Sequence, residues 1–141
     1  MMRVVLDTNA LIQIFGRSTT LVPLREALRH GSLAWAVSTP MLLEYEEVIV
    51  RMSGRSRWED VWSFITLIDL LHDTIHHIGP HYRFHTILGD PDDDIFADCA
   101  IVAQADYLIT SDHHFRALIG SGYQPQPITP EEFIQRHLAG T

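Results

Sequence analysis

Acidic side chains follow two predicted strands of this sequence. Asp7 comes directly after the apolar run 3–6, and Asp112 comes shortly after the run 107–110. The carboxyl ends of parallel strands lie at the same end of a sheet, and ligands bind there. Asp7 and Asp112 are therefore candidates for one shared site. For either residue alone, a turn or a helix cap is the simpler interpretation.

Further acids are expected to reach the same place. Four aspartates stand within residues 90–94, at the start of a predicted helix, and this is more negative charge than capping requires. Glu44 lies one turn into the helix predicted after strand 34–38, although a solvated helix acid is the simpler interpretation of this residue alone. Asp98, farther along the helix that begins near residue 92, is expected to flank the same pocket.

A site built only from carboxylates favours a hard divalent cation. Oxygen ligands select Mg²⁺ or Mn²⁺ over zinc. Such a cation activates water for in-line attack on a phosphate and stabilises the leaving oxygen. The chemistry predicted from the residues is therefore hydrolysis of a phosphodiester.

Composition narrows the choice of function. The 141 residues carry a net charge of −8, which argues against a basic nucleic-acid clamp but suits carboxylates that hold cations. All ten basic residues are arginine, so a P-loop, a Schiff-base enzyme and a receiver domain each lack their lysine. The single cysteine, Cys99, excludes an internal disulfide and a multi-cysteine zinc site. Neither a signal peptide nor a membrane span is apparent, so we expect a cytoplasmic protein.

The elements that must position these acids alternate along the chain. Apolar runs predict strands at residues 3–6, 34–38, 75–78 and 107–110. Helical spacing predicts helices at residues 10–15, 20–30, 41–52, 58–71, from 92 or 93 to 105, and 130–138. Residues 124–126, with prolines nearby, are predicted to form a loop. This alternation predicts one α/β domain over residues 1–141, with a parallel sheet of four or five strands and helices on both faces.

Four short motifs, in this order and at this spacing, resemble the PIN domain family. They are residues 6–11 (LDTNAL), 38–45 (STPMLLEY), 90–100 (DPDDDIFADCA) and 105–112 (ADYLITSD), and the later ITPEEF at 128–133 also fits. The resemblance runs from residue 4 to about residue 133 and is nearest to the VapC-like bacterial branch, the toxin components of toxin–antitoxin pairs.

This resemblance implies a three-layer α/β/α fold and a ribonuclease that cleaves single-stranded RNA with Mg²⁺ or Mn²⁺. It also implies an antitoxin protein as partner and assembly as a homodimer. By the same resemblance, the catalytic and metal-binding acids are Asp7, Glu44, Asp93 and Asp112, with Asp94 and Asp98 as backup ligands.

The resemblance also implies contacts to the substrate. Thr8 and Asn9 on one side, and Thr110 opposite them, are expected to orient Asp7 and the scissile phosphate. The family often has a lysine after its last acid, where this chain has His113. His113 or Arg116 is expected to make that phosphate contact instead.

Two other functions fit the sequence less well. A non-catalytic PIN-like module that binds RNA or protein would be favoured by missing acids, and none is missing. A haloacid-type phosphatase needs a second aspartate two residues after its nucleophile, where this chain has Asn9, and it needs a lysine.

Two further features have competing interpretations. One segment is rich in histidine and comprises His72, His76, His77, His81 and His85. It contains histidine pairs four residues apart, which could bind zinc on a helix. A polar surface or a pH-sensitive contact is the favoured interpretation. Trp35 is predicted to be core. The apolar face of the helix 58–71 is also predicted to be core, and it includes Trp58, Trp62 and residues 67–71. The alternative is that this face is an exposed surface that binds an antitoxin helix or a second copy of the chain.

Overall fold

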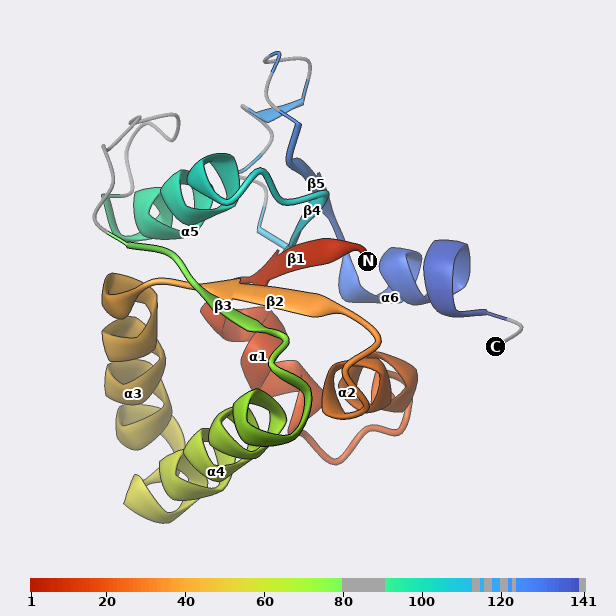
Figure 1. Cartoon of the computed structure of the whole chain (residues 1–141). Helices are drawn as coiled ribbons and strands as arrows, with labels where there is room; N and C mark the ends of the chain where they lie inside the picture. The colour runs from red at the N-terminus through yellow and green to blue at the C-terminus, as the bar shows by residue number, and fades with distance from the viewer. Residues whose placement is uncertain (80–90, 113–114, 116–117, 120–121, 123, 140–141) are drawn as a thin grey trace.

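A parallel sheet lies at the centre of the molecule (Figure 1). The computed structural model describes residues 1–79, 91–112, 115, 118–119, 122 and 124–139, with only the backbone of 91–94. Its strands are β1 (Arg3–Leu6), β2 (Ala34–Val37), β3 (Ile75–His77), β4 (Tyr107–Ile109) and β5 (Gln126–Ile128). Their order is β3-β2-β1-β4-β5, and every pair is parallel. The predicted α/β fold with a parallel sheet of four or five strands is therefore confirmed.

Helices cover both faces of this sheet, as predicted. They are α1 (Thr8–Ile14), α2 (Val22–Arg29), α3 (Thr39–Ser53), α4 (Arg55–His72), α5 (Pro91–Val102) and α6 (Pro130–Phe133), with a π-helical segment, Ile134–Leu138, after α6. Figure 1 shows α5 on one side of the sheet and α1, α2 and α4 on the other. This arrangement gives the three layers that the sequence predicts.

The strand β5 was not predicted, because Pro125 and Pro127 suggested a loop. Gln126–Ile128 pairs in parallel with β4 and lies at the edge of the sheet. An edge strand tolerates a proline such as Pro127, since one side of the strand needs no hydrogen bond. The backbone N–H of Thr110 donates to the carbonyl of Ile128 at 2.8 Å and extends this pairing toward the carboxyl end of the sheet.

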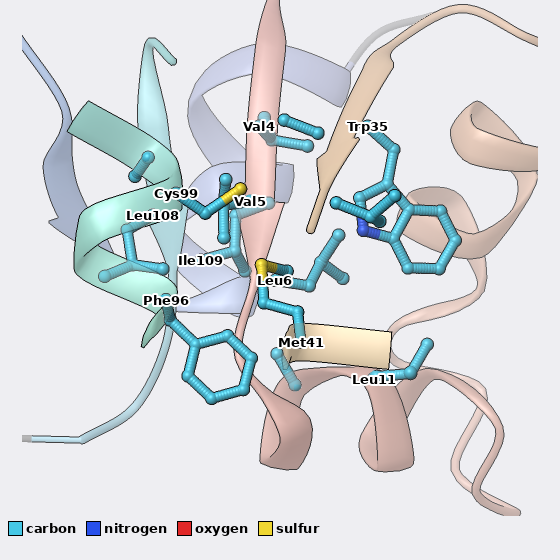
Figure 2. Packing of buried hydrophobic residues seen from close by; sticks show 14 of the residues in the cluster. Val4, Val5, Leu6, Leu11, Trp35, Met41, Phe96, Cys99, Leu108 and Ile109 are labelled. Carbon is cyan, nitrogen blue, oxygen red and sulfur yellow. The ribbon is translucent and has the colours of Figure 1, made fainter. Parts of the chain in front are cut away.

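The central strands form the core of the protein. Figure 2 shows side chains of β1 and β4 packed against Phe96 and Cys99 of α5. Met41 and Leu11 belong to the same cluster. Val4, Val5 and Leu6 are fully buried, as expected for a strand covered on both faces. Trp35 is buried too, which confirms the prediction for that residue.

The helix α4 corrects one prediction about the core. Trp58, Val61, Ile65 and Ile68 are buried, but Trp62 is 41% exposed, Leu70 82% and Leu71 64%. A run of consecutive apolar residues winds around the whole helix, so only part of it can face the sheet. Despite this apolar content, none of the described helices is long and apolar enough to cross a membrane.

The histidine pair His72 and His76 does not lie on one helix. The helix α4 ends at His72, and His76 belongs to β3, so the helical zinc spacing is wrong for this pair. Instead, the Nδ1 atom of His76 accepts a hydrogen bond from Nε of Arg3 at 3.2 Å. His81 and His85 lie outside the described residues.

Candidate active site

Asp7 sits where β1 ends and α1 begins. Its carboxylate Oδ1 accepts a hydrogen bond from the backbone N–H of Ala10 at 2.8 Å, so Asp7 is the N-cap of α1. The residue is only 5% exposed. The capping role predicted as the simpler interpretation is therefore real, but it uses one of the two carboxylate oxygens.

Thr110 connects Asp7 to Asp112. The backbone N–H of Asp112 donates to Oγ1 of Thr110 at 2.9 Å, and the Thr110 hydroxyl donates to Oδ2 of Asp7. The parallel pairing of β1 with β4 brings these residues together, since Leu6 lies opposite Ile109. Asp7 and Asp112 thus lie at neighbouring strand ends, as the sequence predicts. Thr110 therefore orients Asp7, as the resemblance implies, and its contact with the phosphate stays a prediction.

Glu44 reaches the same end of the sheet from α3. This helix starts directly after β2, where Oγ of Ser38 accepts the N–H of Met41 at 3.4 Å. The hydroxyl of Tyr45 donates to the carbonyl of Leu6 at 2.6 Å, which fixes α3 against the last residue of β1. Glu44 precedes Tyr45, so this bond holds its backbone close to Asp7.

These acids surround one cavity of about 240 Å³ at the carboxyl end of the sheet. The described residues that line it are Asp7, Thr8, Asn9, Glu44, Val48, Arg51, Met52, Phe96 and Asp112. Three acids predicted from the sequence and two predicted substrate contacts, Thr8 and Asn9, therefore meet in one place. Asp112 also borders a second cavity, of about 250 Å³, formed with Thr110, Ile128 and Glu132 among others.

Burial raises the pKa of Asp7 above its ordinary value. Two hydrogen bonds, from Thr110 and from the N–H of Ala10, act in the opposite direction, and the nearby carboxylate of Asp112 raises the pKa further. The net result is a carboxylate that is costly to ionise without a compensating positive charge. A cation in the cavity would provide that charge.

The structure does not place the other predicted site residues at the cavity. The side chains of Asp93 and Asp94, and the residues His113 and Arg116, lie outside the described residues. Asp98 is 1% exposed on α5 and is not among the residues that line the cavity.

Comparison with known protein families identifies the family of the chain. A family model of the PIN domain matches residues 3–114. The chain belongs to the PIN domain family. No curated protein matches the sequence.

Solved structures share the fold of this PIN domain. One is the crystal structure of VapBC2 from Rickettsia felis bound to a DNA fragment from their promoter, with 15% identity and a TM-score of 0.59, covering 91% of this chain and 98% of that one. Another is the T. brucei RRP44 PIN domain, with 10% identity and a TM-score of 0.57, covering 95% of this chain and 79% of that one. At such identities the likeness concerns the fold.

The donor set of this PIN domain fits a divalent cation. The acids at the cavity offer only oxygen ligands, and Mg²⁺ needs just one or two carboxylates together with water and phosphate oxygens. Thr8 supports this, because its buried Oγ1 faces no hydrogen-bond partner in the described part of the chain. Among the described side chains no three of His, Cys, Asp or Glu are close enough to hold one ion, so two carboxylates, Asp7 and Asp112, are the ligands best placed.

Three lining residues of α3 were not predicted from the sequence. Val48, Arg51 and Met52 border the cavity on the same helix as Glu44. They stand four, seven and eight residues after Glu44, which is the spacing of one helix face. Helical periodicity counted from Glu44 would have found them.

Proposed function

We propose that this PIN domain is a metal-dependent endoribonuclease that hydrolyses phosphodiester bonds of single-stranded RNA. PIN domains are generally nucleases. The observation that carries the proposal is the meeting of Asp7, Glu44 and Asp112, from three different elements, at one cavity. Structural residues rarely gather like charges around a cavity, because the repulsion destabilises the fold.

Asp7 and Asp112 would bind Mg²⁺ or Mn²⁺ directly. Glu44 and Asp93 would complete the set of acids around the ion, with Asp94 and Asp98 in reserve. When bound, the cation supplies Lewis acidity that activates water and stabilises negative charge on the phosphate. Thr110 keeps Asp7 in place by donating to its Oδ2, while the N–H of Ala10 holds Oδ1. The carboxylate is therefore oriented before substrate arrives.

Other residues of the chain would bind the substrate. Thr8 has an unused buried hydroxyl at the cavity, and Asn9 is exposed beside it, so both can donate to a phosphate oxygen. His113 or Arg116 would supply the contact that a lysine makes elsewhere in the family. Residues 1–141 would act as one nuclease domain.

The test uses the purified chain with an end-labelled single-stranded RNA. Cleavage should require Mg²⁺ or Mn²⁺ and should stop with EDTA. Products should carry 5′-phosphate and 3′-hydroxyl ends, because activated water attacks the phosphorus directly. Cleavage that ignores EDTA, or products with cyclic phosphate ends, would contradict the proposal.

The alternative is a PIN-like module that binds RNA or protein without cleavage. It predicts RNA binding by the parent chain with intact RNA after long incubation with Mn²⁺. The three acids at the cavity favour the enzyme, since a binding surface for RNA gains nothing from them.

We also propose that the chain is the toxin of a toxin–antitoxin pair that acts in the cytoplasm. The similar fold in the Rickettsia felis VapBC2 structure supports this. Expression of the chain alone should arrest growth, and co-expression of an antitoxin from the adjacent reading frame should relieve the arrest. Growth without arrest would contradict the toxin role.

We further propose that the chain forms a homodimer. The exposed apolar side chains of α4, including Trp62, Leu67 and Leu70, are candidates for the contact with a second copy. Light scattering should give twice the mass of 16.1 kDa, and Leu70→Gln should shift the chain toward the monomer. A monomeric mass at micromolar concentration would contradict it.

A further inference from the structure

Arg51 differs from the other residues that line the acidic cavity. Among the described lining residues it carries the one positive charge, facing the three acids Asp7, Glu44 and Asp112. It is exposed, and within the described part of the chain it has no hydrogen bond or ion pair. A guanidinium whose N–H groups are not used within the protein can bind a phosphate with two parallel hydrogen bonds.

The position of Arg51 on α3 decides which phosphate it can reach. It follows Glu44 by seven residues, which is two helical turns or about 10.5 Å along the axis, on the same face. The acids around Asp7 define the place of the scissile phosphate. The backbone of Arg51 is therefore displaced along the helix from the acids, at a part of the same cavity where a neighbouring phosphate of the strand would pass.

The opposite side of the site offers no such contact among the described residues. The second cavity, which begins at Asp112, has the acids Asp112 and Glu132 in its described lining, and Glu132 pairs with Arg136 at 2.7 Å. Among the described residues that line the two cavities, the positive charge that a phosphate can use therefore lies on the Arg51 side.

We propose that Arg51 binds a phosphate flanking the scissile one and directs the RNA strand along α3. This inference rests on the proposed nuclease function and adds a substrate-positioning residue to it. Because the contact is remote from the reacting atoms, it contributes to binding of the strand in the ground state and the transition state alike.

The experiment compares Arg51→Gln with Arg57→Gln. Arg57 lies on α4, is exposed, has no hydrogen bond or ion pair within the described residues, and borders a different cavity with Ile12 and Phe15. Both substitutions remove one charge and keep a good helix former, so the fold should survive in both. The cavity that loses the charge is the acidic one for Arg51→Gln and a different one for Arg57→Gln.

On a single-stranded RNA of about twelve nucleotides, Arg51→Gln should raise KM about tenfold with kcat nearly unchanged, the size of one lost charge-assisted contact. Arg57→Gln should match the parent, and Arg51→Lys should restore part of the affinity. On bis(p-nitrophenyl) phosphate, which has a single phosphate, Arg51→Gln should have no effect. Equal KM values for Arg51→Gln and Arg57→Gln, or equal losses on both substrates, would overturn the proposal.

A binding measurement separates this inference from the nuclease proposal. In EDTA, where the RNA stays intact, the logarithm of affinity falls with the logarithm of salt concentration. Arg51→Gln should reduce that slope by about 0.7, the value for one phosphate contact on a single strand, and Arg57→Gln should leave it unchanged. If the parent never cleaves RNA, the nuclease proposal fails, and an unchanged slope for Arg51→Gln still overturns the role of Arg51 separately.

Discussion

The two ends of the central sheet treat charged groups in opposite ways. At the amino end, Oδ2 of Asp106 accepts the backbone N–H of Arg3 at 2.8 Å, and its Oδ1 accepts from Gln124 at 3.2 Å. The guanidinium of Arg3 donates to the carbonyl of Ala103 and to His76. At the carboxyl end, Asp7, Glu44 and Asp112 line one cavity with a single described cation, Arg51, which has no partner among the described residues.

The difference separates structural charges from functional ones. The hydrogen bond from the N–H of Arg3 to Asp106 joins β1 to the residue before β4, so it contributes to stability. The acids at the other end repel one another, and burial of Asp7 adds to that cost. A fold keeps such an arrangement where a ligand compensates for it, and the compensation is what the following predictions test.

The largest effect is expected for Asp7→Asn. The amide keeps the cap of α1, since asparagine caps helices as well as aspartate does, but it removes one ligand charge. Activity on RNA should fall about 10²-fold or more, while the circular dichroism spectrum stays that of the parent. Asp106→Asn makes the same chemical change at the amino end and should leave kcat/KM unchanged. Parent-like cleavage by Asp7→Asn would remove Asp7 from the site.

Metal binding should appear in stability as well as in activity. Mn²⁺ at about a hundred times its dissociation constant should stabilise the parent by about 2.7 kcal/mol, because it binds only the folded site. This is a rise in Tm of several degrees. Asp7→Asn should lose most of the rise and Asp106→Asn should keep it. An equal rise in all three proteins would indicate that Mn²⁺ binds elsewhere.

Substitutions at the amino end of the sheet should change the stability of the fold and leave the activity unchanged. Asp106→Ala leaves the N–H of Arg3 without its acceptor and should destabilise the fold by about 1–2 kcal/mol. Asp106→Asn keeps one acceptor oxygen and should lose less. Below the melting temperature both variants should cleave RNA at the parent rate. A selective loss of activity in Asp106→Ala would show that the two ends are coupled.

Much of this comparison could be predicted from the sequence, because the fold depends on local patterns. The runs before Asp7 and Asp112 are short and apolar, so their strand ends were evident, and parallel pairing then places both acids at one end. The helix predicted from residue 130 begins there, directly after Thr129. The helix predicted from residue 41 begins two residues earlier, at Thr39, with Ser38 as its N-cap.

What could not be predicted depends on contacts between distant segments. The strand β5 exists only because β4 offers it a partner, and its own proline argues against it. The exposed side of α4 was mistaken for core since apolar content does not tell how much of a helix the sheet can cover. The bond from Thr110 to Asp7 joins residues 103 positions apart, so no local pattern predicts it, and the family resemblance alone pointed to Thr110 as a residue that orients Asp7.

The smallest effect is a pH dependence at Asp7, measured in EDTA. Burial and Asp112 raise the pKa of Asp7 in the folded protein, so its ionised form lowers the free energy of unfolding at neutral pH. Asp7→Asn should therefore be slightly more stable than the parent at pH 7. The advantage should shrink as the pH falls through the raised pKa, and it should vanish below the ordinary aspartate value of about 3.9, where the parent is protonated in both states.

Asp7→Ala separates this charge effect from the cap. It removes the same charge but leaves the N–H of Ala10 without its acceptor, so it should be less stable than Asp7→Asn by about 1 kcal/mol at every pH. Urea unfolding of the three proteins at pH 3.5, 5 and 7 gives the comparison. A parent that is more stable than Asp7→Asn at pH 7 without metal would mean that the carboxylate is stabilised by the fold itself. The carboxyl end would then resemble the amino end, and the contrast between them would lose its basis.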